Sequence, residues 1–233
     1  DYKSSFNFSA KIKMKKTIYT FCAGVFALLT LIGCSKSDDN DSKKNKDKND
    51  IEVTNFNIPK EAKAILPDKT LTEMVANGMT IHEGTNPPNI EGIYLLDNLK
   101  FLYTSDPDDH YFTKGQPAAD YKYKFYDQQG VKVKSDYKAL KFGVFDVATG
   151  YGAIISGSGN KFTVFLSHAA NTEGVKNNDI TLISGELTSQ GIKNLVYVLT
   201  VTQKDDSNNK IMKVGTYRIF THYESIAQKQ TTY

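Results

Sequence analysis

Apolar and polar side chains alternate with a period of two over most of the C-terminal two thirds of the chain. The clearest stretch places Tyr121, Tyr123 and Phe125 on one face and the two intervening lysines on the other. Strict alternation is typical of antiparallel strands that have one face on a core and one face in water. This pattern therefore predicts a mainly β protein.

Eight extended runs can be read from this period, and the separators between them carry turn residues such as Gln129-Gly130 and Gln190-Gly191. A ninth run, Leu99–Thr104, is either a separate strand or the end of the first run. The third run is expected to bend or break near Ala139–Lys141. The eight runs are Ile90–Asp97, Tyr121–Gln128, Val131–Val147, Gly152–Ser158, Lys161–His168, Asp179–Ser189, Ile192–Gln203 and Lys210–Tyr223.

Short links without crossover helices predict an eight-stranded antiparallel meander. A meander of this length must dispose of its two edges. Closure into a barrel leaves an interior that is filled by side chains or holds one small ligand. Stacking into a β-sandwich is the alternative.

A helical lead-in is expected before the strands, over residues 51–89 of a single domain that spans 51–233, with the strands at 90–223. Pro59–Leu66 is expected to form one or two helical turns. Thr70 and Glu73 fit a capping box for a short amphipathic helix at Leu71–Asn77. The run Leu195–Val201 is apolar on both faces, so one face must be covered by this helix or by a partner.

The N-terminal part carries the pattern of a secretory signal. Residues 1–13 precede a plausible start at Met14 and are set aside as an upstream or non-native extension. Residues 14–33 contain two lysines followed by an uncharged apolar run from Ile18 to Ile32. An uncleaved transmembrane helix is the alternative to a signal peptide, but this apolar run is shorter than the roughly 20 apolar residues that such a helix needs. Its end, Leu-Ile-Gly33-Cys34, resembles the bacterial lipobox.

The lipobox resemblance implies cleavage between Gly33 and Cys34 and acylation of the Cys34 thiol, which would anchor the protein in a membrane. Residues 34–50 then form a charged tether with no apolar residue after the cysteine, and such a composition predicts disorder. Ser35 resembles the sorting signal of outer-membrane lipoproteins in Gram-negative bacteria. The run Ser-Lys-Ser-Asp-Asp resembles the export signal of Bacteroidetes surface lipoproteins, and an ordinary solvated linker is the alternative. The expected location is the outer membrane, facing the exterior.

The stretch Thr70–Tyr223 resembles the lipocalin-like, or calycin, β-barrels. The features that carry the resemblance are a helix before the first strand, the sequence Gly92-Ile93-Tyr94 in that strand, the meander, and the lone Arg218 in the last strand. In lipocalins a basic residue of the last strand packs across an aromatic ring of the first. The resemblance thus implies that Arg218 packs across Tyr94, whereas an ordinary surface arginine is the alternative.

The sequence shows no constellation of catalytic residues. Of the two cysteines, Cys22 is expected to leave with the signal and Cys34 to be acylated, so the domain has neither a disulfide nor a thiol nucleophile. The four histidines lack metal-ligand spacing. Asp106, Asp108 and Asp109 concentrate oxygen ligands and are the candidate for calcium, although their spacing does not match an EF-hand. We therefore expect no cofactor and no other metal.

Charge argues against nucleic acid as a partner. Of the net charge of +3, residues 1–33 contribute +4 through five lysines and one aspartate, which leaves −1 for residues 34–233. A mature chain near neutrality lacks the basic surface that nucleic acids need.

A set of aromatic residues and one arginine forms either a ligand pocket or a filled core. Tyrosine rings offer apolar faces with hydroxyl tips. The set is Tyr94, Tyr121, Tyr123, Phe125, Tyr197 and Arg218.

The function that these features predict is a lipid-anchored, surface-exposed, non-enzymatic binding protein. Its ligand would be small and amphipathic or apolar, or a peptide of a partner, held at the barrel mouth. An accessory subunit of an outer-membrane complex is the alternative. A hydrolase comes last, and it would gain support from converging carboxylates in a pocket or from His168 and His222 beside an acid.

Overall fold

The structure is a computed structural model that describes residues 51–140, 146–222 and 225–233. The signal peptide, Cys34 and the tether lie outside the described residues, as do 141–145 of the predicted third strand and Tyr223. The described residues belong to one compact unit, Asn49–Tyr233. Within them the protein is mainly β, with two helices and eleven strands.

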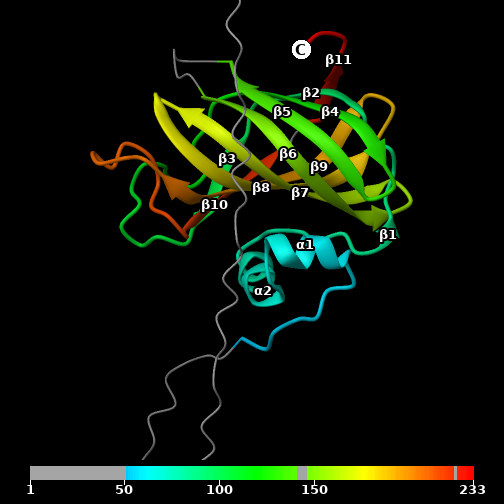
Figure 1. Ribbon diagram of the computed structural model, residues 1–233, viewed down its shortest axis with the longest axis horizontal. Coiled ribbons are helices and arrows are strands. Elements are labelled where there is room, and N and C mark those ends of the chain that lie inside the picture. The colour runs from blue at the N-terminus through cyan, green and yellow to red at the C-terminus, as the bar shows by residue number, and fades with distance from the viewer. Residues whose placement is uncertain (1–50, 141–145, 223–224) are drawn as a thin grey trace, which may run out of the picture. The chain divides into compact units, whose positions relative to one another are not determined.

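The elements follow one another in the order shown in Figure 1. The helices are α1 (Lys60–Ile65) and α2 (Asp68–Ala76). The strands are β1 (Thr85–Asn86), β2 (Gly92–Leu96), β3 (Lys100–Thr104), β4 (Tyr121–Gln129), β5 (Lys132–Ala139), β6 (Asp146–Ser158), β7 (Lys161–Thr172), β8 (Val175–Leu187), β9 (Gly191–Lys204), β10 (Tyr217–His222) and β11 (Ala227–Gln230).

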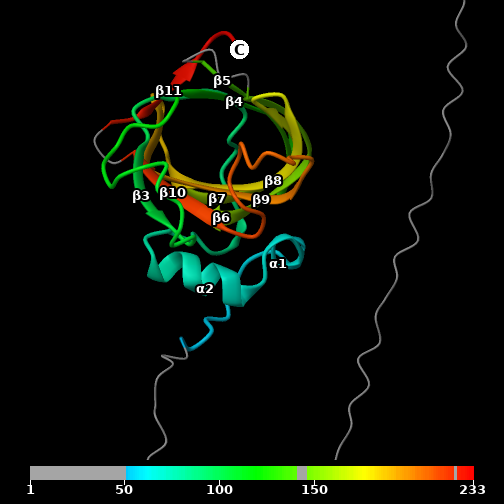
Figure 2. The same ribbon diagram turned by 90° about the vertical axis from the view of Figure 1, so that its left-hand side faces the viewer.

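All of these strands belong to one sheet, not to the two stacked sheets of a sandwich. Consecutive strands from β4 to β9 pair antiparallel, as the predicted meander requires. β2 pairs with β4, β11 pairs with β2, and β11 also pairs with β9. These pairings close a ring of eight strands, which Figure 2 shows nearly end-on.

Where the ring closes, two pairs of short strands follow one another: β2 pairs with β11, and β3 pairs with β10. β2 and β3 are separated by three residues, and they pair with β11 and β10 respectively: Leu95 lies opposite Gln228, and Lys100 lies opposite Thr221. At this seam β11 passes close to Gly191 of β9, where a Cβ would clash with the carbonyl oxygen of Ala227. Glycine is therefore required for this approach, and its φ of 150° also disfavours other residues.

Several strand boundaries differ from the prediction. Leu99–Thr104 does form a strand of its own, β3, and the third run does end at Ala139. β7 continues past His168, and β8 begins before Asp179, because a tight turn at Glu173-Gly174 with positive φ at both residues joins them. The last run was placed too early, because residues 205–216 form a loop and β10 begins at Tyr217.

The predicted helices are both present, but the capping box is wrong. α2 begins at Asp68, two residues before Thr70, and no side chain caps it. Pro67 precedes the helix with φ of −70°, and Asp68 places a negative charge in the first turn. Both features favour an earlier start.

The sheet has an apolar cluster on each side. Leu195 and Tyr197 of β9 point into the ring, whereas Val196 and Val198 pack outside it in a cluster with Leu71 and other residues of the helical segment. Figure 2 shows both helices on the same side of the ring. The prediction that a helix covers one face of Leu195–Val201 is thus confirmed. None of the helices in the described ranges has the length and apolar character needed to cross a membrane.

Candidate functional site

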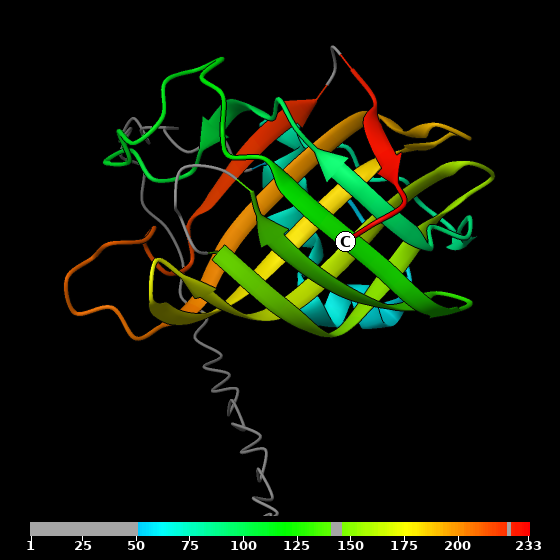
Figure 3. The same ribbon diagram turned by 90° about the horizontal axis from the view of Figure 1, so that it is seen from above.

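The interior of the ring is filled at one end and hollow at the other. Large apolar side chains such as Phe125, Ile155 and Phe162 fill the end where β4 finishes and β7 begins. The opposite end carries the loops 105–120 and 205–216, which project together in Figures 1 and 3. Between these loops and the filled core lies a cavity of about 1000 Å³.

The cavity has a polar and aromatic interior and a charged mouth. Seven strands contribute to it, because inward-facing positions alternate along each strand. The interior is lined by Tyr121, Tyr137, Asp146, Thr172, Asn177, Asp179, Tyr197, Leu199, Val201 and Phe220. The mouth is lined by Asp106, Asp108, Asp109, His110, Tyr111, Phe112, Glu173, Lys204, Lys210, Lys213 and Arg218.

Two buried aspartates, Asp146 of β6 and Asp179 of β8, meet in this interior through Tyr137. The Tyr137 hydroxyl lies 3.2 Å from Oδ1 of Asp146 and 3.2 Å from Oδ2 of Asp179. Asp146 also accepts hydrogen bonds from Thr172, over 2.9 Å, and from Tyr121, over 3.2 Å. The three strands β5, β6 and β8 thus converge on one pair of carboxylates.

Asp179 has a second set of partners deeper in the ring. Its Oδ1 lies 3.0 Å from Nδ1 of His168, which is opposite it in the β7–β8 pairing, and it accepts from the Thr181 hydroxyl over 3.2 Å. The other ring nitrogen of His168, Nε2, is buried and has no hydrogen-bond partner among the described residues. The imidazole and the Tyr137 ring lie edge to face, with 5.0 Å between the ring centroids.

Burial shapes the electrostatics of this group. It raises the pKa of Asp146 above the ordinary 3.8, although the hydrogen bonds from Thr172, Tyr137 and Tyr121 act in the opposite direction. Burial also raises the pKa of Tyr121 and of Tyr137 well above 10, so both hydroxyls keep their protons at neutral pH. The Tyr137 hydroxyl has one proton, so it donates to only one of the two carboxylates at a time.

The aromatic residues predicted as pocket or core divide between the two. Tyr121 and Tyr197 line the cavity. Tyr94, Tyr123 and Phe125 belong to the filled core, although the Tyr123 hydroxyl reaches that of Tyr197 over 3.1 Å.

Arg218 lies at the cavity mouth and does not pack across Tyr94. Its guanidinium donates to both carboxylate oxygens of Asp109, over 2.6 and 2.9 Å, and stands 5.2 and 5.3 Å from the rings of Tyr111 and Phe112. Tyr94 packs instead beside Phe125. The packing implied by the lipocalin resemblance is therefore wrong at this position, because the strong partner of Arg218 lies in the loop after β3.

The aspartates of the calcium candidate make other contacts in the structure. Asp109 is occupied by Arg218, and Asp106 accepts from the backbone amide of Asp108 over 3.1 Å. Within the described ranges, no group of three or more acidic, histidine or cysteine side chains is arranged to hold a metal ion.

Three residues of this buried group, Tyr137, Asp146 and Asp179, were not singled out from the sequence, and its fourth member, His168, was named only as a residue that would favour a hydrolase if it lay beside an acid. A signal was available for part of it. Asp179 is in phase with Thr181 and Ile183, and all three face inward on β8. A charged residue at an inward position of an apolar strand is costly, and such a position indicates a site.

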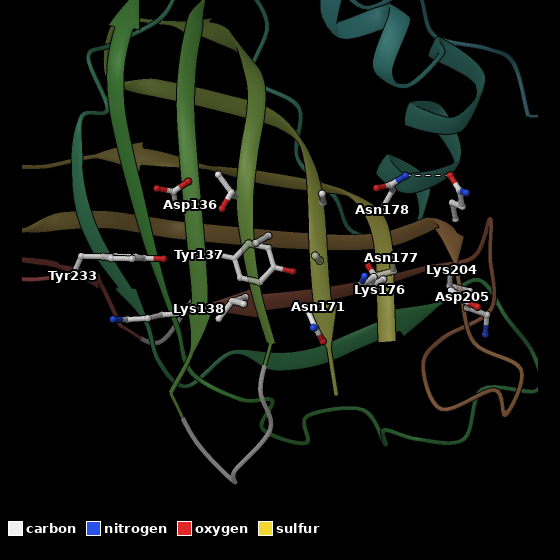
Figure 4. A pocket seen from close by; sticks show the side chains of 16 residues that line it. Asp136, Tyr137, Lys138, Asn171, Lys176, Asn177, Asn178, Lys204, Asp205 and Tyr233 are labelled. Carbon is white, nitrogen blue, oxygen red and sulfur yellow. Dashed lines mark hydrogen bonds between the residues drawn. The ribbon is translucent and has the colours of Figure 1, made fainter. Parts of the chain in front are cut away.

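A second hollow of about 1050 Å³ lies around the ends of β5 to β9 and shares Tyr137, Asn177 and Lys204 with the cavity. Figure 4 shows its labelled side chains, most of which come from β5, β7, β8 and β9. Asn178 of β8 donates a hydrogen bond to Gln203 of β9 over 3.1 Å. Lysine, asparagine and aspartate dominate it, and it lacks a convergent buried group. The cavity inside the ring is thus the better candidate.

Comparisons with protein-family models, with curated proteins and with solved structures each found no match to this chain.

Proposed function

We propose that this chain is a lipid-anchored binding protein that holds one small ligand inside a lipocalin-like barrel. The observation that carries the proposal is the cavity of about 1000 Å³ in one end of the eight-stranded ring. Small-molecule sites are concave, lined mainly by apolar and aromatic groups, and oriented by a few polar ones. The rings of Tyr121, Tyr197 and Phe220 and the carboxylates of Asp146 and Asp179 match that description.

The covering of the outer face favours binding inside the ring over a role as an accessory subunit. That alternative was based on the second apolar face of Leu195–Val201. The chain's own helical segment packs on this face through residues such as Leu71 and Met74, so no partner is needed to shield it.

The binding proposal can be tested by capture. The purified domain 51–233 is incubated with a metabolite mixture and examined by native mass spectrometry and by thermal unfolding. A retained small molecule that raises the melting temperature supports the proposal. Leu199→Trp fills the cavity and should abolish capture, whereas Val75→Trp places the same ring on an exposed position of α2. Capture that survives Leu199→Trp, or no capture by the parent domain, would contradict it.

The anchor is a separate part of the proposal and has its own test. Two or three acyl chains on Cys34 would hold the protein firmly, because each buried methylene contributes about 0.8 kcal/mol. Cys34→Ala should move the protein from the membrane fraction to the soluble fraction of cells. Surface display is then checked by protease treatment of intact cells that express the parent chain.

A hydrolase is the second candidate, because the structure brings together the converging carboxylates that the sequence analysis could not see. Asp146 has a raised pKa suited to a general acid, and His168 stands beside Asp179. Glycosidases use such pairs of carboxylates. Hydrolysis of a panel of chromogenic glycosides and esters that disappears in Asp146→Asn would support it. Absence of turnover across the panel would count against it.

A further inference from the structure

We propose that the ligand of the ring cavity carries a cationic amine on an aromatic or apolar body, and that Asp146 and Asp179 bind the amine. This inference rests on the proposed binding function and specifies its ligand. The charge, the hydrogen bonding and the aromatic lining of the cavity interior support it.

The first observation is an unbalanced charge. Asp146 and Asp179 are 5% and 1% exposed and both line the cavity. In the described part of the chain, no lysine or arginine nitrogen forms an ion pair with either carboxylate, and the basic side chain that contacts them is His168, beside Asp179. His168 contacts Asp179, so no basic side chain of the described residues contacts the carboxylate of Asp146. Buried charges in proteins are normally paired.

The second observation is a missing hydrogen-bond donor. Tyr137 is the group that joins the two carboxylates, with 3.2 Å to each. Because its hydroxyl has a single proton, one of the carboxylates always lacks that bond. A primary ammonium group has three donors, so it can reach both carboxylates and supply the donor that the protein lacks.

The third observation is the aromatic wall around this charge. The rings of Tyr121 and Tyr197 lie in a stacked arrangement with 6.0 Å between centroids, and Tyr121 meets Tyr137 edge to face at 5.8 Å. Faces of aromatic rings attract cations, and such cages recognise substituted ammonium groups. The remaining wall, with Leu199, Val201 and Phe220, suits the apolar part of the same ligand.

The mouth of the cavity does not reverse this preference, because three of its four lysine and arginine side chains already face acids of the protein, and the fourth, Lys210, shares the mouth with Asp108 and Glu173. These pairs lie within 4.0 Å, and they leave the unpaired negative charge in the interior as the main determinant of ligand charge. The pairs are Arg218 with Asp109, Lys204 with Asp206, and Lys213 with Asp106.

Three probes that differ only in their charged end test the inference on the unmodified domain at pH 7. They are tyramine, the neutral alcohol tyrosol and the acid 4-hydroxyphenylacetate, each titrated by calorimetry and NMR. Tyramine should bind at least about tenfold more tightly than tyrosol, since hydrogen bonds between charged groups are stronger than those between neutral groups. The acid should bind most weakly. Equal affinities for tyramine and tyrosol would overturn the inference.

Substitutions of the two buried aspartates provide a second test of the inference. Asp146→Asn and Asp179→Asn keep the shape of the side chain and should each weaken tyramine binding by about 10- to 100-fold, with tyrosol changed by no more than about twofold. Asp205→Asn makes the same charge change on the exposed surface near the same end of the ring and should leave both affinities unchanged. Unaltered tyramine binding in Asp146→Asn would contradict the inference even if Asp179→Asn failed to fold.

The outcomes separate this inference from the proposed function. If none of the three probes binds while the domain captures another molecule that Leu199→Trp excludes, the amine preference is wrong and the binding function stands. If the domain captures nothing either, both fail.

Discussion

Arg218 donates two hydrogen bonds to the carboxylate of Asp109, over 2.6 Å from Nε and 2.9 Å from Nη2. The two residues are 109 positions apart in the sequence, so the pair ties the loop after β3 to β10. A planar guanidinium matches a carboxylate in this two-bond geometry, which lysine does not reproduce. The pair therefore determines how the mouth of the cavity is held.

Replacing this arginine should loosen the mouth. We expect Arg218→Lys to lower the free energy of unfolding by about 1–3 kcal/mol, because one charge-assisted bond and the contacts with two rings are lost. Urea denaturation measures the change, and hydrogen exchange should show faster exchange in residues 105–116. Lys213→Ala removes an exposed ion pair with 4.0 Å separation and should cost less than about 0.5 kcal/mol. Equal effects of the two substitutions would contradict this account.

The same pair predicts a pH dependence. Burial alone would raise the pKa of Asp109, but the hydrogen bonds from Arg218, the Tyr111 amide and Thr104 bring it below its ordinary 3.8. A lowered pKa in the folded state gives stability that is present above about pH 4 and lost as the pH falls through that pKa. The stability difference between the parent chain and Arg218→Lys should therefore shrink between pH 5 and about pH 3. Urea denaturation at several pH values measures it, and a constant difference would contradict the ion pair.

Asp146 should show the opposite sign. Its pKa is raised in the folded state, chiefly by burial, so the stability it contributes is present below pH 3.8 and is lost as the pH rises through the raised pKa. Asp146→Asn removes that cost. We expect the free domain to gain about 0.5–2 kcal/mol at pH 7 and to lose part of its pH dependence. Denaturation curves measured at pH 4 and pH 7 check this, and a destabilised variant at pH 7 would contradict it.

The helical segment should be essential for covering the outer face of the ring. Leu71 of α2 is fully buried in the outer cluster with Val196 and Val198. We expect Leu71→Ala to cost about 2–5 kcal/mol, as for other large apolar side chains cut back in a core. Val75 lies on the same helix and is 39% exposed, so Val75→Ala should stay within about 0.5 kcal/mol. Comparable losses for the two would mean that the helix does not pack as described.

Closure of the ring should depend on Gly191. Gly191 and Gly152 have nearly the same φ, 150° and 147°, but only a Cβ at Gly191 would meet the backbone of Ala227. Both changes to alanine carry backbone strain of about 1–3 kcal/mol. Gly191→Ala should cost more and should also expose the Lys229 amide, which donates to the Gln190 carbonyl over 2.8 Å. Amide exchange of Lys229 checks this, and protection unchanged from that of Gly152→Ala would contradict it.

Much of the sheet could be predicted from the sequence. The alternation of apolar and polar residues, as in Tyr121, Tyr123 and Phe125, indicates which side chains face inward. The helical segment was predictable for the same reason, with a period near four. The strand boundaries at the seam were not predictable, because Gln228 and Lys229 of β11 are both exposed and the strand shows no alternation. It forms a strand only because β2 and β9 are both present beside it.

The candidate site divides in the same way. Tyr121 and Tyr197 were selected from the sequence as candidates for a ligand pocket or a filled core. The approach of Asp146 to Asp179 through Tyr137 was not predictable from the sequence. The two aspartates are 33 positions and two turns apart, and local periodicity does not show which strands face each other across the ring. Likewise, Arg218 was noticed as the lone arginine, but its partner Asp109 was assigned to calcium.

The sequence by itself determined most of the strands from β2 to β9, which face of those strands is apolar, and the need to cover both faces of β9, because these depend on local periodicity and composition. Tertiary structure alone decided where the ring is hollow and what meets there. Closure brings strands distant in sequence into register, and only that register places Tyr137 between two buried carboxylates.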